Sequence, residues 1–292
     1  MPIMKTFYFN SLFSSARTIK QVLFDCLRRR TRSSAMYNNF IDSYRPQGIY
    51  TVEFLAGLLN KLDSDGYCII PGYLTLSQCE LARYVIDELA NNRSLRRWHG
   101  HLNADLRLWG VENSHSIFSQ FFNDYILNAI GSIQAGEELK SLLVMAGRLS
   151  AISGNLGSGE GWHRDATSFQ YKSITYLSDV DTCNGPFQVI CRSHKPIVKL
   201  YQNARLNGIL NLQNSRFPTI AEADLLPGFL KANLKTLSAS SGDCILVNTS
   251  TLHRGMPIIS GSRYAITNYY YPTSELPFRE SQFGSLRINS SY

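Results

Sequence analysis

The chain has 292 residues, of which 44% are hydrophobic and 17% are charged, and its formal net charge is +7. This composition is typical of a folded globular protein and excludes a wholly disordered chain. No apolar run approaches the roughly 18 residues that are needed to cross a bilayer, so no transmembrane helix is expected.

The excess positive charge is concentrated at the N-terminus. Residues 1–35 hold seven basic side chains and one acidic side chain, which leaves a net charge of about +1 on the rest of the chain. Nucleic-acid binding depends on basic side chains that neutralise phosphates. Because the remainder of the chain is nearly neutral, we expect no nucleic-acid partner.

We treat residues 1–50 as a basic segment that precedes a globular domain at 51–292. Several of its apolar side chains share part of one helical face, which is compatible with an amphipathic helix in peripheral contact with a membrane. The shortage of acids also resembles a mitochondrial targeting sequence. An unstructured terminus and a helix packed on the body are the alternatives. The apolar side chains are Phe13, Ile19, Val22, Leu23 and Leu27.

The globular part begins with a helix, a turn and a short strand. Four leucines at helical spacing predict one buried stripe, and Asp65-Gly66 marks the turn that follows. Residues 67–70 read as a buried strand that ends at Pro71-Gly72. The stripe consists of Leu55, Leu58, Leu59 and Leu62.

Two further helices are predicted before the β-rich part. Thr75 and Gln78 form a capping box that opens the first helix, and the second spans 116–130. The buried face of the first helix would include Leu81, Val85 and Leu89.

After residue 140 the sequence changes to short β-type runs separated by Gly, Pro, Asn and Ser, with a helical and irregular stretch at 196–230. A helical N-terminal part followed by a β-rich C-terminal part predicts a single α+β domain. So many short strands suit a jelly-roll sandwich or barrel. The predicted strands are 142–151, 173–177, 187–191, 234–239, 244–248 and 263–271.

Residues 161–169 read GWHRDATSF, and the histidine and aspartate of this segment follow a stretch with four glycines, from Gly154 to Gly161. The spacing of His163 and Asp165 would send both side chains to one face of a strand, as two ligands of one ion require. A surface histidine beside an acid is equally compatible with this motif alone. His253, which follows a later β-type run, adds a third donor. Two histidines and one carboxylate form the facial triad that holds Fe(II) and leaves positions open for a co-substrate and dioxygen.

Arg263 opens a strand ten residues after His253, and Ala265, Thr267 and Tyr269 share its face of that strand. A guanidinium group binds a carboxylate through two parallel hydrogen bonds, as the far end of a dicarboxylate co-substrate requires. A surface charge is the alternative, but the apolar strand that follows favours an inward position.

Four segments in this order resemble the phytanoyl-CoA dioxygenase family: DGYCIIPGYLTLSQCELA, GWHRDATSF, YLSDVDTCNGPFQVICRSHK and GDCILVNTSTLHRG with SGSRYAITNYYY. The resemblance covers roughly residues 60 to 271. It implies a double-stranded β-helix core of the jelly-roll, cupin-like type with flanking N-terminal helices, and it implies Fe(II) and 2-oxoglutarate. Residue by residue, it implies that His163, Asp165 and His253 are iron ligands and that Arg263 binds the distal carboxylate of 2-oxoglutarate, while Ser150 and Tyr176 line the co-substrate pocket.

The chain departs from the family at residues 191–195, where Cys-Arg-Ser-His-Lys replaces Pro-Gly-Ser-His-Lys. We therefore interpret His194 as structural. His99, His101 and His115 precede the β-rich part and are expected to be solvated or core residues. Side chains that could border the cleft, but could equally be core or ion-paired residues, are Trp98, Trp109 and Arg148. Trp162 is expected to be a packing residue next to His163, and orientation of His163 is the alternative.

The resemblance implies an Fe(II)- and 2-oxoglutarate-dependent dioxygenase that hydroxylates a small metabolite, acyl or sugar substrate. A related halogenase is disfavoured because halogenases lack the carboxylate that Asp165 supplies. A non-catalytic β-helix protein for sensing or assembly is the alternative outside enzymes.

Six cysteines without a C-x-x-C pair predict reduced thiols and a cytoplasmic location.

Overall fold

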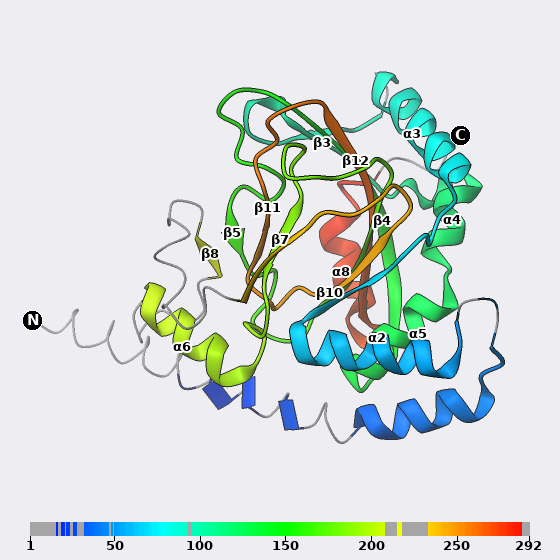
Figure 1. Cartoon of the computed structure of the whole chain (residues 1–292), viewed down its shortest axis with the longest axis vertical. Helices are drawn as coiled ribbons and strands as arrows, with labels where there is room; N and C mark the ends of the chain where they lie inside the picture. Colours follow the sequence, from blue (N-terminus) through cyan, green and yellow to red (C-terminus); the bar gives the residue numbers. More distant parts are fainter. Residues whose placement is uncertain are drawn as a thin grey trace, which may run out of the picture.

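The computed structural model describes most of the chain (Figure 1). Phe13 of the N-terminal segment lies outside the described residues. The described residues are 16, 19–20, 22–23, 26–27, 32–46, 48, 50–92, 95–207, 215–217 and 233–287.

Within the N-terminal segment, residues 32–43 form a helix that runs along α2 (Val52–Asp65) (Figure 1). Its apolar side chains pack against the same core cluster as those of α2. Val22 is buried, whereas Leu23 and Leu27 are 44% and 70% exposed. The predicted apolar face is therefore only partly covered. The side chains that contact the core are Met36, Tyr37 and Phe40.

The first two predicted elements are confirmed. Thr51 caps α2 by accepting a hydrogen bond from the Phe54 amide, and all four leucines of the predicted stripe are buried. Gly66 ends α2 with φ of 90°, a conformation that glycine adopts without strain. Strand β1 (Tyr67–Ile70) follows directly.

The next helix, α3 (Leu76–Asn91), starts at the predicted capping box of Thr75 and Gln78. Of its predicted buried face, Val85 and Leu89 are partly buried and pack against the core, whereas Leu81 is 42% exposed; the fully buried residues lie one position further along the helix. The buried residues are Cys79, Ala82, Ile86 and Ala90.

The predicted helix at 116–130 is two helices, α4 (Ser116–Phe122) and α5 (Tyr125–Ala135). Asp124 separates them because its carboxylate accepts a hydrogen bond from the Leu127 amide, 2.9 Å away, and so begins a new helix. Helical spacing alone does not show this break.

Twelve strands form two antiparallel sheets within the described residues. The larger sheet has the order β1-β10-β6-β12-β4-β3-β2, and the smaller has the order β8-β5-β11-β7-β9. All six predicted strands are present with small shifts at their ends. Besides β1, the strands are β2 (Trp98–His99), β3 (Asp105–Trp109), β4 (Leu139–Ser150), β5 (Trp162–His163), β6 (Tyr171–Tyr176), β7 (Phe187–Ile190), β8 (Arg216–Phe217), β9 (Leu234–Leu237), β10 (Cys244–Asn248), β11 (His253–Gly255) and β12 (Ser262–Pro272).

The elements form layers, with helices α2 to α5 over one face of the larger sheet and the smaller sheet beside its other face (Figure 1). One apolar core joins the helices to the larger sheet, and a second core contains side chains of both sheets. Helix α6 (Pro196–Asn207) lies beside the smaller sheet, and α8 (Leu276–Phe283) follows β12. The predicted α+β class with antiparallel sheets is confirmed.

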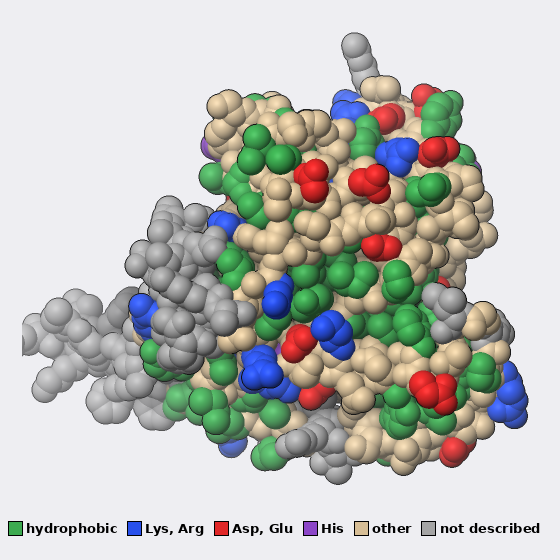
Figure 2. Space-filling model, viewed as in Figure 1, with side chains coloured by type: hydrophobic (Ala, Val, Ile, Leu, Met, Phe, Trp, Pro, Cys, Tyr) green, Lys and Arg blue, Asp and Glu red, His purple; other side chains and the backbone are tan. Residues whose placement is uncertain are grey.

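Surface charge and cysteine state agree with the sequence. Figure 2 shows basic and acidic side chains mixed over one face of the molecule. All six cysteines are described and are free thiols, as predicted. Every helix in the described part of the chain is too short or too polar to cross a bilayer.

Candidate metal centre

The two histidines of the predicted triad are direct neighbours in the smaller sheet. His163 ends β5, His253 begins β11, and the antiparallel register places these two residues opposite each other. Their ring centroids are 4.4 Å apart. Two short strands that are distant in the chain therefore bring two imidazoles to one point.

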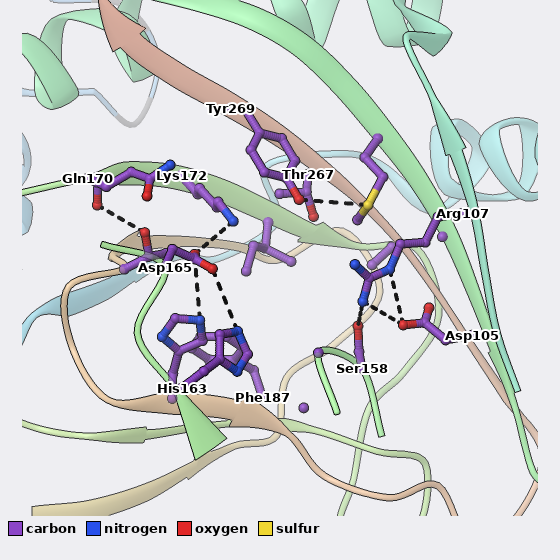
Figure 3. A pocket seen from close by; sticks show the side chains of 18 of the residues that line it. Asp105, Arg107, Ser158, His163, Asp165, Gln170, Lys172, Phe187, Thr267 and Tyr269 are labelled. Atoms are coloured by element: carbon purple, nitrogen blue, oxygen red, sulfur yellow. Dashed lines mark hydrogen bonds and ion pairs between the residues drawn. The ribbon is translucent and has the colours of Figure 1, made fainter. Parts of the chain in front are cut away.

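Asp165 completes the group. Its Oδ1 atom is 3.6 Å from Nε2 of His163, and its Oδ2 atom is 3.7 Å from Nε2 of His253 (Figure 3). One potential ligand atom from each residue lies within 4.8 Å of the others. The strand ends at His163, so Asp165 is positioned by its own amide, which donates to the Thr249 carbonyl 3.0 Å away. The three side chains are close enough to bind one ion.

Backbone carbonyls orient both imidazoles. Nδ1 of His163 is 2.8 Å from the Gly161 carbonyl oxygen, and Nδ1 of His253 is 2.8 Å from that of Thr251. A carbonyl oxygen can only accept, so each Nδ1 carries the proton and each Nε2 presents its lone pair toward Asp165. Such contacts fix the tautomer and orientation of metal-binding histidines.

The ionisation states suit a divalent cation. Burial lowers the pKa of His253 to about 3 and also lowers the pKa of His163, so both rings are neutral. Burial alone would raise the pKa of Asp165, but the neighbouring charge of Lys172 opposes it and holds that pKa below its usual range. Two neutral imidazoles and one carboxylate are a donor set that fits Fe(II).

The glycine-rich stretch before His163 lies against the two histidine-bearing strands. Gly159 has φ of +86°, and a Cβ atom there would be 2.5 Å from Cε1 of His163. Gly157 has φ of +75°, and its Cβ would be 2.2 Å from the Gly255 carbonyl oxygen. Glycine is therefore required at both positions by conformation and by space.

Gly159→Ala is expected to displace the His163 ring and to lower iron affinity about 10- to 100-fold, the range seen when support of a ligand is lost. Gly154→Ala is the matched control, because Gly154 also has positive φ, +82°, but its Cβ would meet only the Leu102 side chain at 3.4 Å. Anaerobic Fe(II) titration of both variants measures the effect. Equal losses in the two would show that backbone strain, and not contact with His163, is responsible.

A cavity of about 400 Å³ contains the triad. Alternate residues of β12 line it from Arg263 at one end to Tyr271 at the other, which confirms the predicted shared face of this strand. The opposite wall includes residues 158–159 and β11. The cationic side chains that line the cavity as a whole are Arg107, Lys172, Arg216, Arg263 and Arg279.

Arg263 points into this cavity and is only 9% exposed. Its Nη1 donates to the Gly185 carbonyl, and its Nε finds no hydrogen-bond acceptor among the described residues. The guanidinium group therefore has N–H donors left for a ligand. The alternative of a surface charge is wrong.

Of the two further residues expected in the co-substrate pocket, Tyr176 lines the cavity and Ser150 does not. Tyr176 lines the cavity, but its hydroxyl accepts from the Phe187 amide and donates to the Leu237 carbonyl. Ser150 is absent from the lining, whereas Leu149 and Gly147 are part of it. Alternation along β4 turns Ser150 to the opposite face, so the structure does not bring it to the triad.

Of the three residues that could border the cleft, one lines the cavity and two form contacts outside it. Trp109 lines the cavity, whereas Trp98 stacks on the Arg107 guanidinium at 4.7 Å. Arg148 forms an ion pair with Asp87 at 2.7 Å, on the face of β4 away from the cavity.

Buried residues near the small sheet serve packing. Trp162 is 1% exposed within an apolar cluster, beneath the guanidinium group of Arg254 at 4.7 Å. Nε2 of His194 is 2.9 Å from the Asp63 carbonyl oxygen, which agrees with its interpretation as structural.

Sequence reasoning missed Lys172, Arg107 and the contribution of α8 to the cavity. Lys172 shares its strand face with Ile174 and Tyr176, and this alternation was the available signal. Arg107 is held by Asp105 at 2.6 Å and contacts Ser158 at 3.2 Å (Figure 3). Nothing in the local sequence predicts that α8 contributes Arg279 and Phe283.

Several solved structures share this fold. The non-heme α-ketoglutarate-dependent epimerase SnoN from nogalamycin biosynthesis has a TM-score of 0.57 at 16% identity, over 76% of this chain and 84% of its own. HygX from Streptomyces hygroscopicus, with nickel and 2-oxoglutarate bound, has a TM-score of 0.55 at 17% identity, over 74% and 87%. EctD from S. alaskensis has a TM-score of 0.57 at 14% identity, over 80% of each chain. At these identities the likeness concerns the fold.

A search of curated proteins finds no match to the chain. The family model described as phytanoyl-CoA dioxygenase matches residues 62–265, which is most of the chain and includes the triad and Arg263. Together with the donor set, this match confirms the predicted Fe(II)- and 2-oxoglutarate-dependent oxygenase class. The chain belongs to the phytanoyl-CoA dioxygenase family.

Proposed function

We propose that this protein is an Fe(II)- and 2-oxoglutarate-dependent dioxygenase that hydroxylates a small molecule. The observation that carries the proposal is the convergence of His163, Asp165 and His253, one ligand atom from each within 4.8 Å, inside a cavity that also holds Arg263. The bound iron would supply the activation of dioxygen that couples decarboxylation of 2-oxoglutarate to oxidation of the substrate.

The residues of the chain would divide the remaining tasks. His163, Asp165 and His253 would hold the metal through two neutral nitrogens and one carboxylate. Arg263 would bind the distal carboxylate of 2-oxoglutarate through its N–H groups. Burial of the triad would exclude bulk water from the reacting atoms. Tyr176 would shape the pocket by its ring, since its hydroxyl is engaged with backbone groups.

The substrate would occupy the end of the cavity opposite Arg263. Tyr269 and Tyr271 line that end from β12, and Trp109 and Phe283 join them in one apolar cluster. A second cavity of about 360 Å³ shares lining residues with the first, among them Tyr271. These walls suit a small molecule with an apolar part, which agrees with the metabolite, acyl or sugar substrates implied by the family.

We also propose a double-stranded β-helix for the two facing sheets, supported by the fold shared with known 2-oxoglutarate-dependent enzymes. Residues 51–292 would form the catalytic domain. For residues 1–50, peripheral membrane contact and mitochondrial targeting stay predictions, as does a cytoplasmic location. The packing of residues 32–43 on the core supports a helix that belongs to the body.

Purified protein is expected to bind one Fe(II) and to form succinate from 2-oxoglutarate in an iron- and dioxygen-dependent manner, slowly without substrate and faster with it. Mass spectrometry of metabolites that accumulate when the protein is absent would supply substrate candidates. Iron binding without any succinate formation would favour the non-catalytic sensing or assembly protein instead.

A further inference from the structure

A buried lysine contacts the proposed metal ligand Asp165. Nζ of Lys172 is 2.8 Å from Oδ2 of Asp165, and the side chains are 12% and 16% exposed (Figure 3). The ammonium group also lies 4.1 Å from the centre of the Tyr269 ring. These two contacts hold the ammonium group between an anion and the negative face of an aromatic ring.

Strand register explains why Lys172 is in the cavity. It lies on β6 opposite Tyr269 of β12, and its neighbours Tyr171 and Ser173 turn toward the helix-covered face of the sheet. Alternation along the strand thus directs Lys172 to the metal side. Its position does not depend on a flexible loop.

The ammonium group of Lys172 is enclosed by these partners, and its side chain is only 12% exposed. Burial of a charged group is unfavourable unless a partner compensates it. Because the ligand set proposed above does not use Lys172, its presence beside the triad calls for a separate role.

The role follows from the two oxygens of Asp165. A carboxylate can bind a metal ion through one oxygen or through both. A facial triad that uses one oxygen leaves three positions open, two for 2-oxoglutarate and one for dioxygen. A second oxygen on the metal would occupy one of those three positions.

We propose that Lys172 is a positioning residue that binds Oδ2 of Asp165 and leaves Oδ1 as the single oxygen presented to the metal. The proposal rests on the metal site and function proposed above. It assigns to one side chain the task of keeping a coordination position open for the co-substrate.

Lys172→Met removes the ammonium group and keeps the length of the side chain. Iron stoichiometry is expected to stay at one, because no ligand is lost and a repelling charge disappears. Affinity for 2-oxoglutarate is expected to fall about 10- to 100-fold, as for other residues that support metal ligands. Titration of 2-oxoglutarate into the anaerobic Fe(II) protein is monitored through the visible charge-transfer band of the complex. The titration gives the amplitude of that band and the affinity for 2-oxoglutarate.

Pyruvate separates this effect from that of Arg263, because it has the 2-oxo acid group and lacks a distal carboxylate. Lys172→Met is expected to lower the affinities for 2-oxoglutarate and for pyruvate by the same factor. Arg263→Ala is expected to lower the affinity for 2-oxoglutarate alone. Lys195→Met is the matched control, since Lys195 pairs with Asp63 at 3.2 Å outside the cavity. Lys172→Arg, which keeps a cationic N–H donor, is expected to stay closer to wild type.

Two results would overturn the proposal. Unchanged binding of both 2-oxo acids by Lys172→Met would show that Asp165 needs no restraint, and loss of iron from that variant would show that Lys172 maintains the site as a whole. If Lys172→Met does not fold, Lys172→Ala, which leaves room for water beside Asp165, carries the same expectation. Failure of the wild-type protein to bind Fe(II) would instead overturn the proposed function itself.

Discussion

Replacement of His163 or His253 by alanine is expected to abolish turnover while the protein remains folded. Each variant would lose one of three ligands, and the effect should exceed the about 10- to 100-fold loss typical of residues that only support a ligand. Iron content after anaerobic loading, succinate formation and thermal unfolding by circular dichroism are the measurements.

His194→Gln is the matched control for these variants. His194 is also buried, but it bonds to the Asp63 carbonyl and is not part of the triad. Its replacement is expected to change the unfolding temperature more than the iron stoichiometry. Full iron content and activity in His163→Ala would remove that residue from the ligand set.

Replacement of Arg263 is expected to lower the affinity for 2-oxoglutarate and to leave iron binding intact. Loss of a charge-assisted pair in a closed site costs about 2–5 kcal/mol, which corresponds to roughly 30- to several-thousand-fold in affinity. Arg263→Ala should show the larger loss, and Arg263→Lys a smaller one, because lysine keeps the charge without the two parallel donors. Titration of 2-oxoglutarate into the anaerobic Fe(II) protein tests both variants.

Arg148→Lys is the control for a change of arginine on the same sheet, since Arg148 pairs with Asp87 on the opposite face. If neither Arg263 variant differs from wild type, another cation of the cavity must hold the co-substrate. Arg107 would then be the first to test, because it lines the cavity from β3.

Much of the site could be anticipated because it depends on local spacing and on ordered motifs. The histidine-aspartate spacing, the later histidine and Arg263 all lie in segments that resemble the family, and the structure brings these residues into one cavity. Strand alternation also anticipated the shared face of β12. These features need no knowledge of which strands pair.

The features that could not be anticipated depend on pairing between distant segments. Strands β5 and β11 have two and three residues, too few to show alternation, so the contact between His163 and His253 is visible only in the folded sheet. Ser150 was placed in the co-substrate pocket by the resemblance alone, and the cavity lining includes Gly147 and Leu149 of the same strand but not Ser150. Lys172 alternates with Ile174 and Tyr176, but only the pairing of β6 with β12 shows that this strand face looks toward the triad.

The smaller sheet that carries both histidines is made of strands with no more than four residues each among the described ones. Its pairing of β5 with β11 joins parts of the chain that meet only after the segments between them have been placed. Loop closure of this kind is entropically unfavourable, so this sheet is expected to be among the last parts to assemble and the first to open. An ion held across β5 and β11 binds the closed form alone and therefore shifts that opening equilibrium by mass action. Iron supply would then control the lifetime of the sheet as well as the reaction that it supports.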